Sequence, residues 1–285
     1  MPVAIVTDST SDIDPPRALE LGIDVVPLFV IFGERSYRDY VDLSRAEFYE
    51  RLGAGPMLPT TSQPTVAMFE EVFAKRTSWG DEVVCVLISQ TLSGTINAAG
   101  SAVALVPGAQ IHLVDSQTVA GGLRMQVEQA VRLKADGASG SEIVEALRSN
   151  LRTQRLYAVA PDLSHLERTG RIGKAKAALG TLLRIVPVLR LVQGAVEIEA
   201  QVRTFTRAQD AMIEAALRSV SESRYARLMV MHTKAPALAQ RVAATLEGRL
   251  PGAPRSLEIV EAGPVIAAHA GPGAVGVFYM EDRAA

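Results

Sequence analysis

The chain has 285 residues, of which 48% are hydrophobic and 5% are aromatic, and its formal net charge is −2 at pH 7. This length predicts two domains with a substantial aliphatic core. The nearly balanced charge provides no basic surface for nucleic acid, so we expect no nucleic-acid partner. Cys85 is the only cysteine, which excludes an internal disulfide bond and a cysteine metal cluster and predicts an inert buried thiol.

The longest apolar run, residues 25–32, contains Pro27 and is far shorter than the ~20 residues of a membrane helix. We predict that this run is one buried strand, and we expect no transmembrane segment. Residues 1–8 lead directly into a strand and lack both the basic region and the cleavage site of a secretory signal. We therefore expect a cytoplasmic protein, for which a transient contact with a membrane surface stays open.

In the first half of the chain, short apolar runs alternate with helical patterns. Because these runs lack polar alternation, they predict strands that are covered on both faces. We expect an N-terminal α/β domain, residues 1–153, with a mainly parallel sheet between helices and Ser141 as the N-cap of its last helix. Strands are predicted at residues 3–6, 25–32, 83–88 and 111–114, and helices at residues 15–21, 44–52, 66–75, 95–106, 119–135 and 141–153.

The second half predicts a C-terminal α/β domain, residues 154–285. The Gln193-Gly194 step between two short apolar segments indicates a hairpin, so this sheet is expected to be mixed. Strands are predicted at residues 156–159, 188–192, 195–200, 228–232, 257–260 and 275–280, and helices at residues 207–220 and 235–250.

Three hydroxyl-rich turns are predicted at residues 60–64, 89–95 and 115–118. The last two directly follow predicted strands. Ligands of open α/β sheets bind at the carboxyl ends of the strands, so these turns are expected to lie at one edge and to converge. Neutral donors in such a cluster suit a carboxylate, a phosphate or a sugar, and they do not by themselves indicate bond-breaking chemistry.

Ser93-Gly94-Thr95 opens a predicted helix, where hydroxyl groups, backbone N–H groups and the helix dipole favour an anion. An ordinary N-cap needs one Ser or Thr, whereas residues 89–95 contain four hydroxyl residues, so anion binding is the better explanation. Thr61 and Ser62 precede a proline that is typical of a first helical turn, and helix capping explains them equally well.

Two other polar positions have competing explanations. The turn at residues 7–12 contains Asp8 and Asp12, which could suggest a magnesium site, but Asp and Ser are also common where helices begin, and a structural role is favoured. His269 lies in a predicted loop of small residues, where an imidazole could reach a ligand or pack in the interior. The four histidines do not have the spacing of metal ligands.

The chain resembles the DegV family of bacterial fatty-acid-binding proteins. The resemblance rests on segments that run in order along essentially the whole chain, each weak alone and specific together. These segments are residues 7–12, 61–64, 92–95, 115–116, 170–172, 202–204 and 269–273.

The resemblance implies a two-domain α/β lipid carrier without catalytic residues, cofactor or metal, which encloses one long-chain fatty acid in an apolar tunnel. It implies that Thr61 and Ser93 hold the carboxyl group, and that a separate fatty acid kinase converts this group to acyl phosphate for phospholipid synthesis. Arg171 and Arg203 match family positions near the head group or the kinase. The full set of implied ligand-binding residues is Thr61, Ser62, Ser93, Gly94, Thr95, His269 and Ala270.

Two residues depart from the family pattern: Ala120 stands where many members have Ser, and Val186 stands where Lys is common. The first puts a direct contact of the neighbouring turn with the head group in doubt. The competing function is a serine-dependent acyl hydrolase or phosphotransferase with Ser93 as nucleophile and His269 as base. Neither a nucleotide-binding loop nor a nucleophile elbow supports it. A regulatory module that binds another small acid is the third hypothesis.

Overall fold

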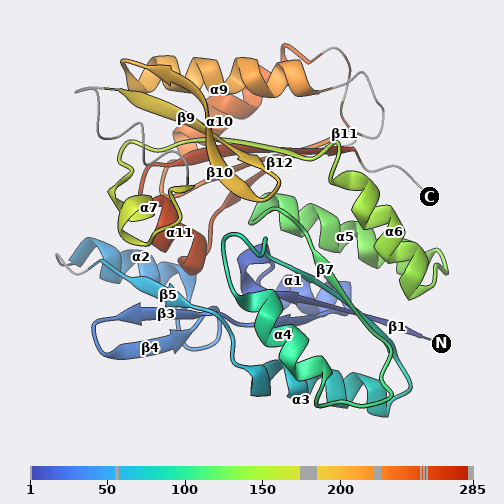
Figure 1. Cartoon of the computed structure of the whole chain (residues 1–285). Helices are drawn as coiled ribbons and strands as arrows, with labels where there is room; N and C mark the ends of the chain where they lie inside the picture. Colours follow the sequence, from blue (N-terminus) through green and yellow to red (C-terminus); the bar gives the residue numbers. More distant parts are fainter. Residues whose placement is uncertain are drawn as a thin grey trace. The chain divides into compact units, whose positions relative to one another are not determined.

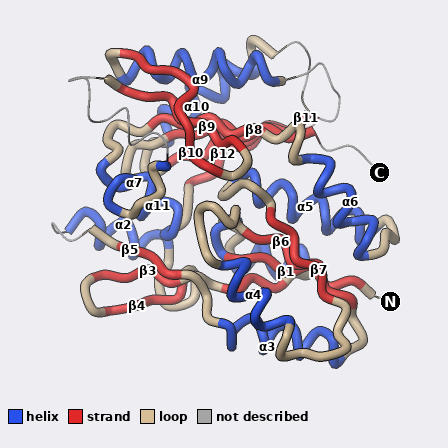
Figure 2. Tube along the Cα trace, in the orientation of Figure 1, coloured by secondary structure: helices blue, strands red, loops and turns tan. Residues whose placement is uncertain are grey.

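The computed structural model describes residues 2–54, 58–173, 185–220, 226–250, 252, 254 and 256–281. The chain forms two compact units, many of whose elements are labelled in Figure 1 and which are coloured by secondary structure in Figure 2. The first unit comprises Met1–Leu151 together with Gly263–Val265, and the second comprises Arg152–Ala262 and Ile266–Arg283. No helix among the described residues is long and apolar enough to cross a membrane.

The first unit contains a four-stranded sheet in the order β2-β1-β6-β7. All its neighbouring strands pair in parallel, which confirms the predicted parallel sheet. Its strands are β1 (Val3–Asp8), β2 (Asp24–Val26), β6 (Glu82–Leu87) and β7 (Ile111–Asp115).

Helices cover both faces of this sheet because alternate strand residues are apolar in both directions. On β1, Val3 and Ile5 pack into one buried cluster with α5 (Gly121–Ala135) and α6 (Gly140–Asn150). Ala4 and Val6 pack into the other cluster, with α3 (Val66–Ser78) and α4 (Thr95–Val103). This alternation explains the strongly apolar strand sequences.

The predicted strand at residues 25–32 is wrong as a single element. Pro27 separates β2 from β3 (Phe29–Phe32), and the two strands belong to different sheets. Proline has no N–H group to donate to a ladder, so an uninterrupted strand is disfavoured here. A three-stranded sheet, β4-β3-β5, results, in which β4 (Arg35–Arg38) and β5 (Thr60–Ser62) both pair antiparallel to β3. The helix α2 (Arg45–Ala54) packs on it through Phe48, whose ring lies 5.9 Å from that of Phe32.

The second unit contains a six-stranded mixed sheet in the order β10-β9-β8-β13-β11-β12. Only β11 and β12 pair in parallel, while the other neighbours pair antiparallel. Gln193 and Gly194, with φ of 49° and 79°, form the predicted hairpin turn between β9 and β10. The strands are β8 (Arg155–Val159), β9 (Val186–Val192), β10 (Ala195–Val202), β11 (Ala226–His232), β12 (Ser256–Glu261) and β13 (Val275–Glu281).

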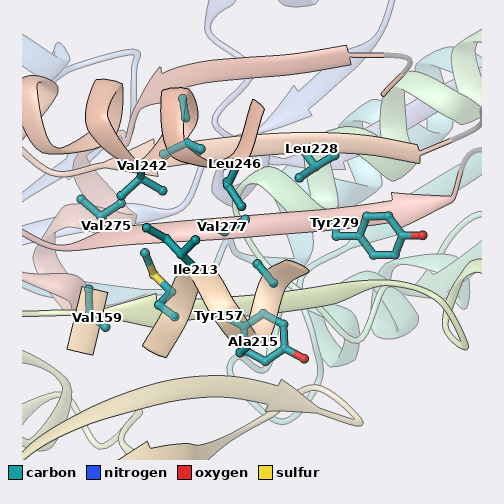
Figure 3. Close-up of a cluster of buried hydrophobic side chains, with 14 of the residues drawn as sticks. Tyr157, Val159, Ile213, Ala215, Leu228, Val242, Leu246, Val275, Val277 and Tyr279 are labelled. Carbon is teal, nitrogen blue, oxygen red and sulfur yellow. The ribbon is translucent and has the colours of Figure 1, made fainter. Parts of the chain in front are cut away.

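The core of the second unit lies between this sheet and two helices, α9 (Phe205–Ser219) and α10 (Pro236–Glu247). Figure 3 shows alternate residues of β13 (Val275, Val277 and Tyr279) on one face, in the same cluster as Ile213 of α9 and Leu246 of α10. The period of two along β13 selects the residues that are buried against the helices.

Several helix ends differ from the sequence prediction. Ser139, not Ser141, caps α6, because its side chain forms a reciprocal capping box with Glu142. Two short helices, α7 (Ser164–Arg168) and α11 (Pro264–Ala270), were not predicted. The remaining short elements are α1 (Pro15–Leu21) and the 3-10 turn η1 (Ser9–Ser11).

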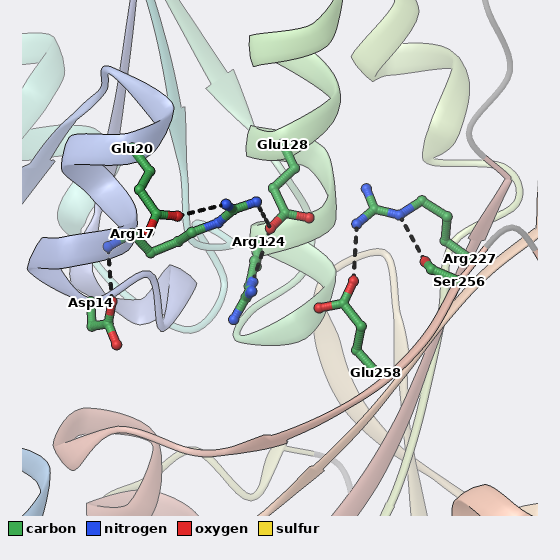
Figure 4. Close-up of polar contacts among 8 residues, drawn as sticks. All are labelled: Asp14, Arg17, Glu20, Arg124, Glu128, Arg227, Ser256 and Glu258. Atoms are coloured by element: carbon green, nitrogen blue, oxygen red, sulfur yellow. Dashed lines mark hydrogen bonds and ion pairs between the residues drawn. The ribbon is translucent and has the colours of Figure 1, made fainter.

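Ion pairs connect neighbouring helices or strands within each unit (Figure 4). In the first, Arg17 on α1 pairs with Glu128 on α5 at 3.7 Å, and Arg124 pairs with the same carboxylate at 3.1 Å. In the second, the buried Arg227 lies 3.9 Å from Glu258 on the neighbouring strand. Partly buried pairs of this kind fix one element against another more than they add net stability.

Candidate ligand-binding site

The turn between β6 and α4 has the form that the sequence predicts. β6 ends at Leu87 and α4 begins at Thr95. The N–H groups of Leu92 and Ser93 donate to the carbonyl oxygen of Ser89 at 3.0 and 3.1 Å. The hydroxyl groups of Ser93 and Thr95 are hydrogen-bonded at 2.8 Å. Ser93 is half-buried, so its hydroxyl stands at the boundary between solvent and interior.

A second hydroxyl-rich turn, between β7 and α5, is hydrogen-bonded to the first. The Ser89 N–H donates to the Thr118 carbonyl oxygen at 2.9 Å. The Asp115 carboxylate accepts from the Gln90 N–H at 3.2 Å and from the Gln117 N–H at 3.0 Å. The two turns therefore form one connected structure at the carboxyl ends of neighbouring strands, as predicted.

The third predicted turn, residues 60–64, also lies beside the turn that carries Ser93, although its first three residues form the strand β5. Thr61 lies on β5 and pairs with Val30 of β3, which corrects the predicted turn. β-Branched threonine suits a strand, and this run carried no apolar signal that would have revealed it. The side chain of Gln63 lies against Gly94: a Cβ at that glycine would come within 2.1 Å of Gln63 Oε1. The three segments converge.

Helix capping does not explain the hydroxyl groups of this site. Gly94 is the N-cap of α4 and forms no side-chain cap hydrogen bond, so the Ser93 hydroxyl is not used as a cap. The side chain of Thr65 caps α3, so the capping explanation for Thr61 and Ser62 is wrong. Hydroxyl donors beside the N-terminus of the nine-residue helix α4 instead suit the binding of an anion.

His269 lies on the short helix α11 and not in the predicted loop. Proline at position 264 opens this helix and was the signal that could have revealed it. Burial, followed by the positive charges of Arg171 and His165, lowers the pKa of His269 to about 4. The imidazole is therefore neutral at pH 7, and it can donate one hydrogen bond to a ligand without adding charge.

The chain after His269 is fixed by Thr233, a residue that was not predicted to take part in the site. The Thr233 hydroxyl donates to the Gly271 carbonyl oxygen at 2.5 Å and accepts from the Ala274 N–H at 2.9 Å. Gly271 has φ +71°, and a Cβ there would lie 2.8 Å from the ring of His165. Ala270, half-buried, ends α11 just before this glycine. A threonine directly after a strand was the available signal.

The two predicted arginines differ in their surroundings. Arg171 is half-buried, its guanidinium donates to the Thr169 carbonyl oxygen at 2.5 Å, and its charge acts on His269. Arg203 is exposed and directly precedes Thr204, the N-cap of α9. Arg171 thus belongs with the half-buried imidazole of His269, whereas Arg203 is exposed at the surface.

Metal chemistry and thiol chemistry receive no support from the described part of the chain. Among these residues, no group of three or more His, Cys, Asp or Glu side chains could hold a metal ion. Cys85 is fully buried on β6, and burial raises the pKa of its thiol well above the usual value. Such a thiol stays protonated and unreactive.

Residues 2–282 match the family model described as "Uncharacterised protein, DegV family". A DegV domain-containing protein of Halalkalibacterium halodurans is 36% identical over 282 residues, which cover 98% of this chain and 99% of that protein. The chain belongs to the DegV family.

Solved structures of the DegV family share the fold along the whole chain. A structure from Thermus thermophilus, described as fatty acid binding of a DegV family protein, has a TM-score of 0.91 and 32% identity, and the match covers 99% of this chain and 100% of that one. A stearic-acid-binding protein from Eubacterium ventriosum has a TM-score of 0.90 and 27% identity, with 98% of each chain covered. These similarities confirm the predicted two-part DegV-like α/β fold.

Proposed function

We propose that this DegV-family chain binds a long-chain fatty acid and that Thr61 and Ser93 hold its carboxyl group. The observation that carries the proposal is the convergence of three hydroxyl-bearing segments whose hydroxyl groups do not cap their helices. Fatty acid binding by similar structures supports the nature of the ligand. The other proposed ligand contacts are Ser62, Gly94, Thr95, His269 and Ala270.

The acyl tail would supply most of the affinity. Burying a sixteen-carbon tail at ~0.8 kcal/mol per methylene yields on the order of 11 kcal/mol of gross driving force. The aliphatic, aromatic-poor composition of the chain is compatible with an apolar tunnel for such a tail. The hydroxyl groups would then mainly orient the carboxyl group and select against uncharged lipids.

The second part of the proposal is that the bound carboxyl group is presented to a separate fatty acid kinase, which forms acyl phosphate. This part rests on the family resemblance, and the exposed Arg203 is its candidate contact with the kinase. The neighbour of the Ser93 hydroxyl is the hydroxyl of Thr95 at 2.8 Å, which is not a general base, so this geometry favours a carrier over a serine hydrolase.

Replacing Ser93 by Ala tests the carboxyl-binding role. Loss of one hydrogen-bond partner of a buried anion costs ~1 to 3 kcal/mol, so palmitate should bind roughly 5-fold to 150-fold more weakly. Isothermal titration calorimetry would measure the affinity. Ser101→Ala is the matched control, because its hydroxyl lies on α4 but donates to the Asn97 carbonyl oxygen. Equal affinity in Ser93→Ala and the wild type would remove Ser93 from the site.

Mass spectrometry of the purified protein separates the two function classes. A carrier should release unmodified, stoichiometric fatty acid on denaturation. A covalent mass increment on Ser93, or saturable ester hydrolysis by the protein alone, would establish the hydrolase instead.

A further inference from the structure

The turn at residues 7–12 is buried over its whole length and has no part in the proposed ligand contacts. Its Asp8 carboxylate accepts from the Ile88 N–H at 2.8 Å, and its other oxygen accepts from the Thr10 N–H at 2.9 Å. Ile88 directly precedes the turn that carries Ser93. Asp8 thus fixes the point at which the chain leaves β6 toward the hydroxyl-rich site.

The same turn also holds two neighbouring segments. The Ser9 hydroxyl accepts from the Leu28 N–H at 3.0 Å, beside the break between β2 and β3. The Thr10 carbonyl oxygen accepts from the Ala120 N–H at 2.9 Å, at the start of α5. The turn therefore sets the relative positions of several segments of the first unit.

Asp12 makes the contact that is most distant in sequence. Its Oδ1 accepts from the Gly263 N–H at 2.9 Å and from the Tyr40 hydroxyl at 3.4 Å. Gly263 is packed so closely that a Cβ there would come within 2.3 Å of the Tyr40 hydroxyl and 2.5 Å of Asp12 Oδ1. Gly263 directly precedes α11, the helix that carries His269.

The backbone around this contact is strained. Asp12 has φ 53° and Tyr40 has φ 60°, both in the left-handed region. Aspartate tolerates this region better than most residues, whereas a tyrosine there is an outlier that the surrounding structure must maintain. Because Asp12 and Tyr40 are hydrogen-bonded to each other and both have strained backbones, the surrounding structure must hold both residues in place.

Burial brings the ionisation of the Asp12 carboxyl group into the neutral pH range. Burial raises its pKa to about 7, against the opposing influence of its partners. Those partners are the Gly263 N–H, Arg45, Tyr40 and Arg124. Burial also raises the pKa of Asp39 well above its usual range, and the negative charges of Asp12 and Asp8 add to this rise.

We propose that Asp12 is a positioning residue whose carboxyl group fixes Gly263 and thereby orients α11 and His269 for ligand binding. This inference rests on the proposed function, because it assigns to His269 a place beside the fatty acid head group. A carboxylate accepts the Gly263 N–H more strongly than a carboxylic acid does. The positioning should therefore tighten as pH rises through the neutral range.

Two substitutions separate the role of the Asp12 carboxyl oxygen as a hydrogen-bond acceptor from the need for a positive φ at this residue. Asp12→Asn keeps an acceptor oxygen and tolerates positive φ, whereas Asp12→Gly tolerates positive φ but removes the acceptor. Palmitate affinity should fall about tenfold in Asp12→Gly and stay within about threefold of the wild type in Asp12→Asn. Asp136→Asn, an exposed aspartate at the end of α5, is the control for charge removal.

The NMR signal of the His269 ring provides a readout that does not depend on fatty acid binding. Relative to the wild type, this signal should shift in Asp12→Gly and keep its wild-type position in Asp12→Asn. In the wild type, it should change between about pH 6 and about pH 8, where Asp12 titrates. If Asp12→Gly does not fold, Gly263→Ala, which displaces the same carboxyl group, should shift the ring signal likewise. An unchanged ring signal, or equal losses in Asn and Gly variants, overturns the inference. Wild-type protein that binds no palmitate overturns the proposed function instead.

Discussion

His269 combines a polar ring with an environment that keeps it uncharged. Burial, followed by the charges of Arg171 and His165, lowers its pKa from 6.5 to about 4. The unfolded chain takes up a proton at this ring below pH 6.5, whereas the folded chain does so only near pH 4. The contribution of His269 to stability is therefore complete above pH 6.5 and is lost as the pH falls through about 4.

A pH titration of the histidine ring signals by NMR tests this environment. Arg171→Gln should raise the pKa of His269, because it removes the largest charge that opposes protonation. Adding palmitate should raise it as well, since a nearby carboxylate favours imidazolium. Arg168→Gln is the matched control, an exposed arginine that is not among the causes of the shift. If the His269 pKa does not move in Arg171→Gln, the guanidinium does not act on the ring.

At the scale of elements, the start of α5 carries a conformation that alanine rarely adopts. Ala120 has φ 53° and ψ −126° and is an N-cap without a side-chain hydrogen bond. Its N–H donates to the Thr10 carbonyl oxygen at 2.9 Å, which holds the residue in place. Glycine adopts positive φ without steric cost, whereas an L-residue does not. The turn therefore stores strain next to the candidate site.

Ala120→Gly should relieve this strain and raise the free energy of unfolding by about 1 kcal/mol. Urea denaturation followed by circular dichroism measures the change. Ala104→Gly is the matched control: Ala104 ends α4 with φ −66° in the right-handed region, so glycine there should lower stability. A lower urea midpoint for Ala120→Gly than for the wild type would show that the alanine methyl group stabilises the turn by more than the backbone strain destabilises it.

The sequence predicted elements with a strong apolar signal and missed those without one. β1, β6 and β7 are short, mostly apolar strands that helices cover on both faces, so their apolar sequences agree with their burial. β5 has only three residues, Thr60–Ser62, and α11 has only seven, so neither is long enough to carry a clear amphipathic pattern. Tertiary hydrogen bonds and packing decide their conformations, and a single sequence does not reveal these.

The candidate site was predicted as far as local chemistry allowed. Convergence of the two turns after β6 and β7 followed from the topology of a parallel sheet, and the structure confirms it. The third segment includes β5 of the antiparallel sheet and reaches the site through Gln63, which that topology did not predict. The contact of Asp12 with Gly263 spans 251 residues, and no local pattern predicts a hydrogen bond of that kind. Its position directly after a strand marks Thr233, but its hydrogen bond to the Gly271 carbonyl oxygen spans 38 residues, so the partner is not visible in a local pattern.

For the whole molecule, the two units carry different parts of the proposed function. The hydroxyl cluster belongs to the first unit, whereas His269, Arg171 and Arg203 belong to the second. Composition predicts no nucleic-acid partner, because the net charge of the whole chain is only −2, and this stays a prediction. It could not predict which acyl chain is preferred, because that depends on the shape of the interior.

The exposed Arg203 tests whether the molecule acts with a kinase. A guanidinium fork binds phosphate or carboxylate through two parallel hydrogen bonds. If this arginine serves the partner step, Arg203→Ala should keep palmitate affinity within about twofold and slow acyl phosphate formation about tenfold when kinase and ATP are added. Arg207→Ala is the matched control, because Arg207 is an exposed arginine in the first turn of α9, the helix whose N-cap Thr204 directly follows Arg203. The chain alone should consume no ATP. If Arg203→Ala is phosphorylated at the wild-type rate across a range of kinase concentrations, Arg203 is an ordinary surface charge. If Arg203→Ala instead loses palmitate binding, the arginine contacts the fatty acid carboxylate before any kinase binds.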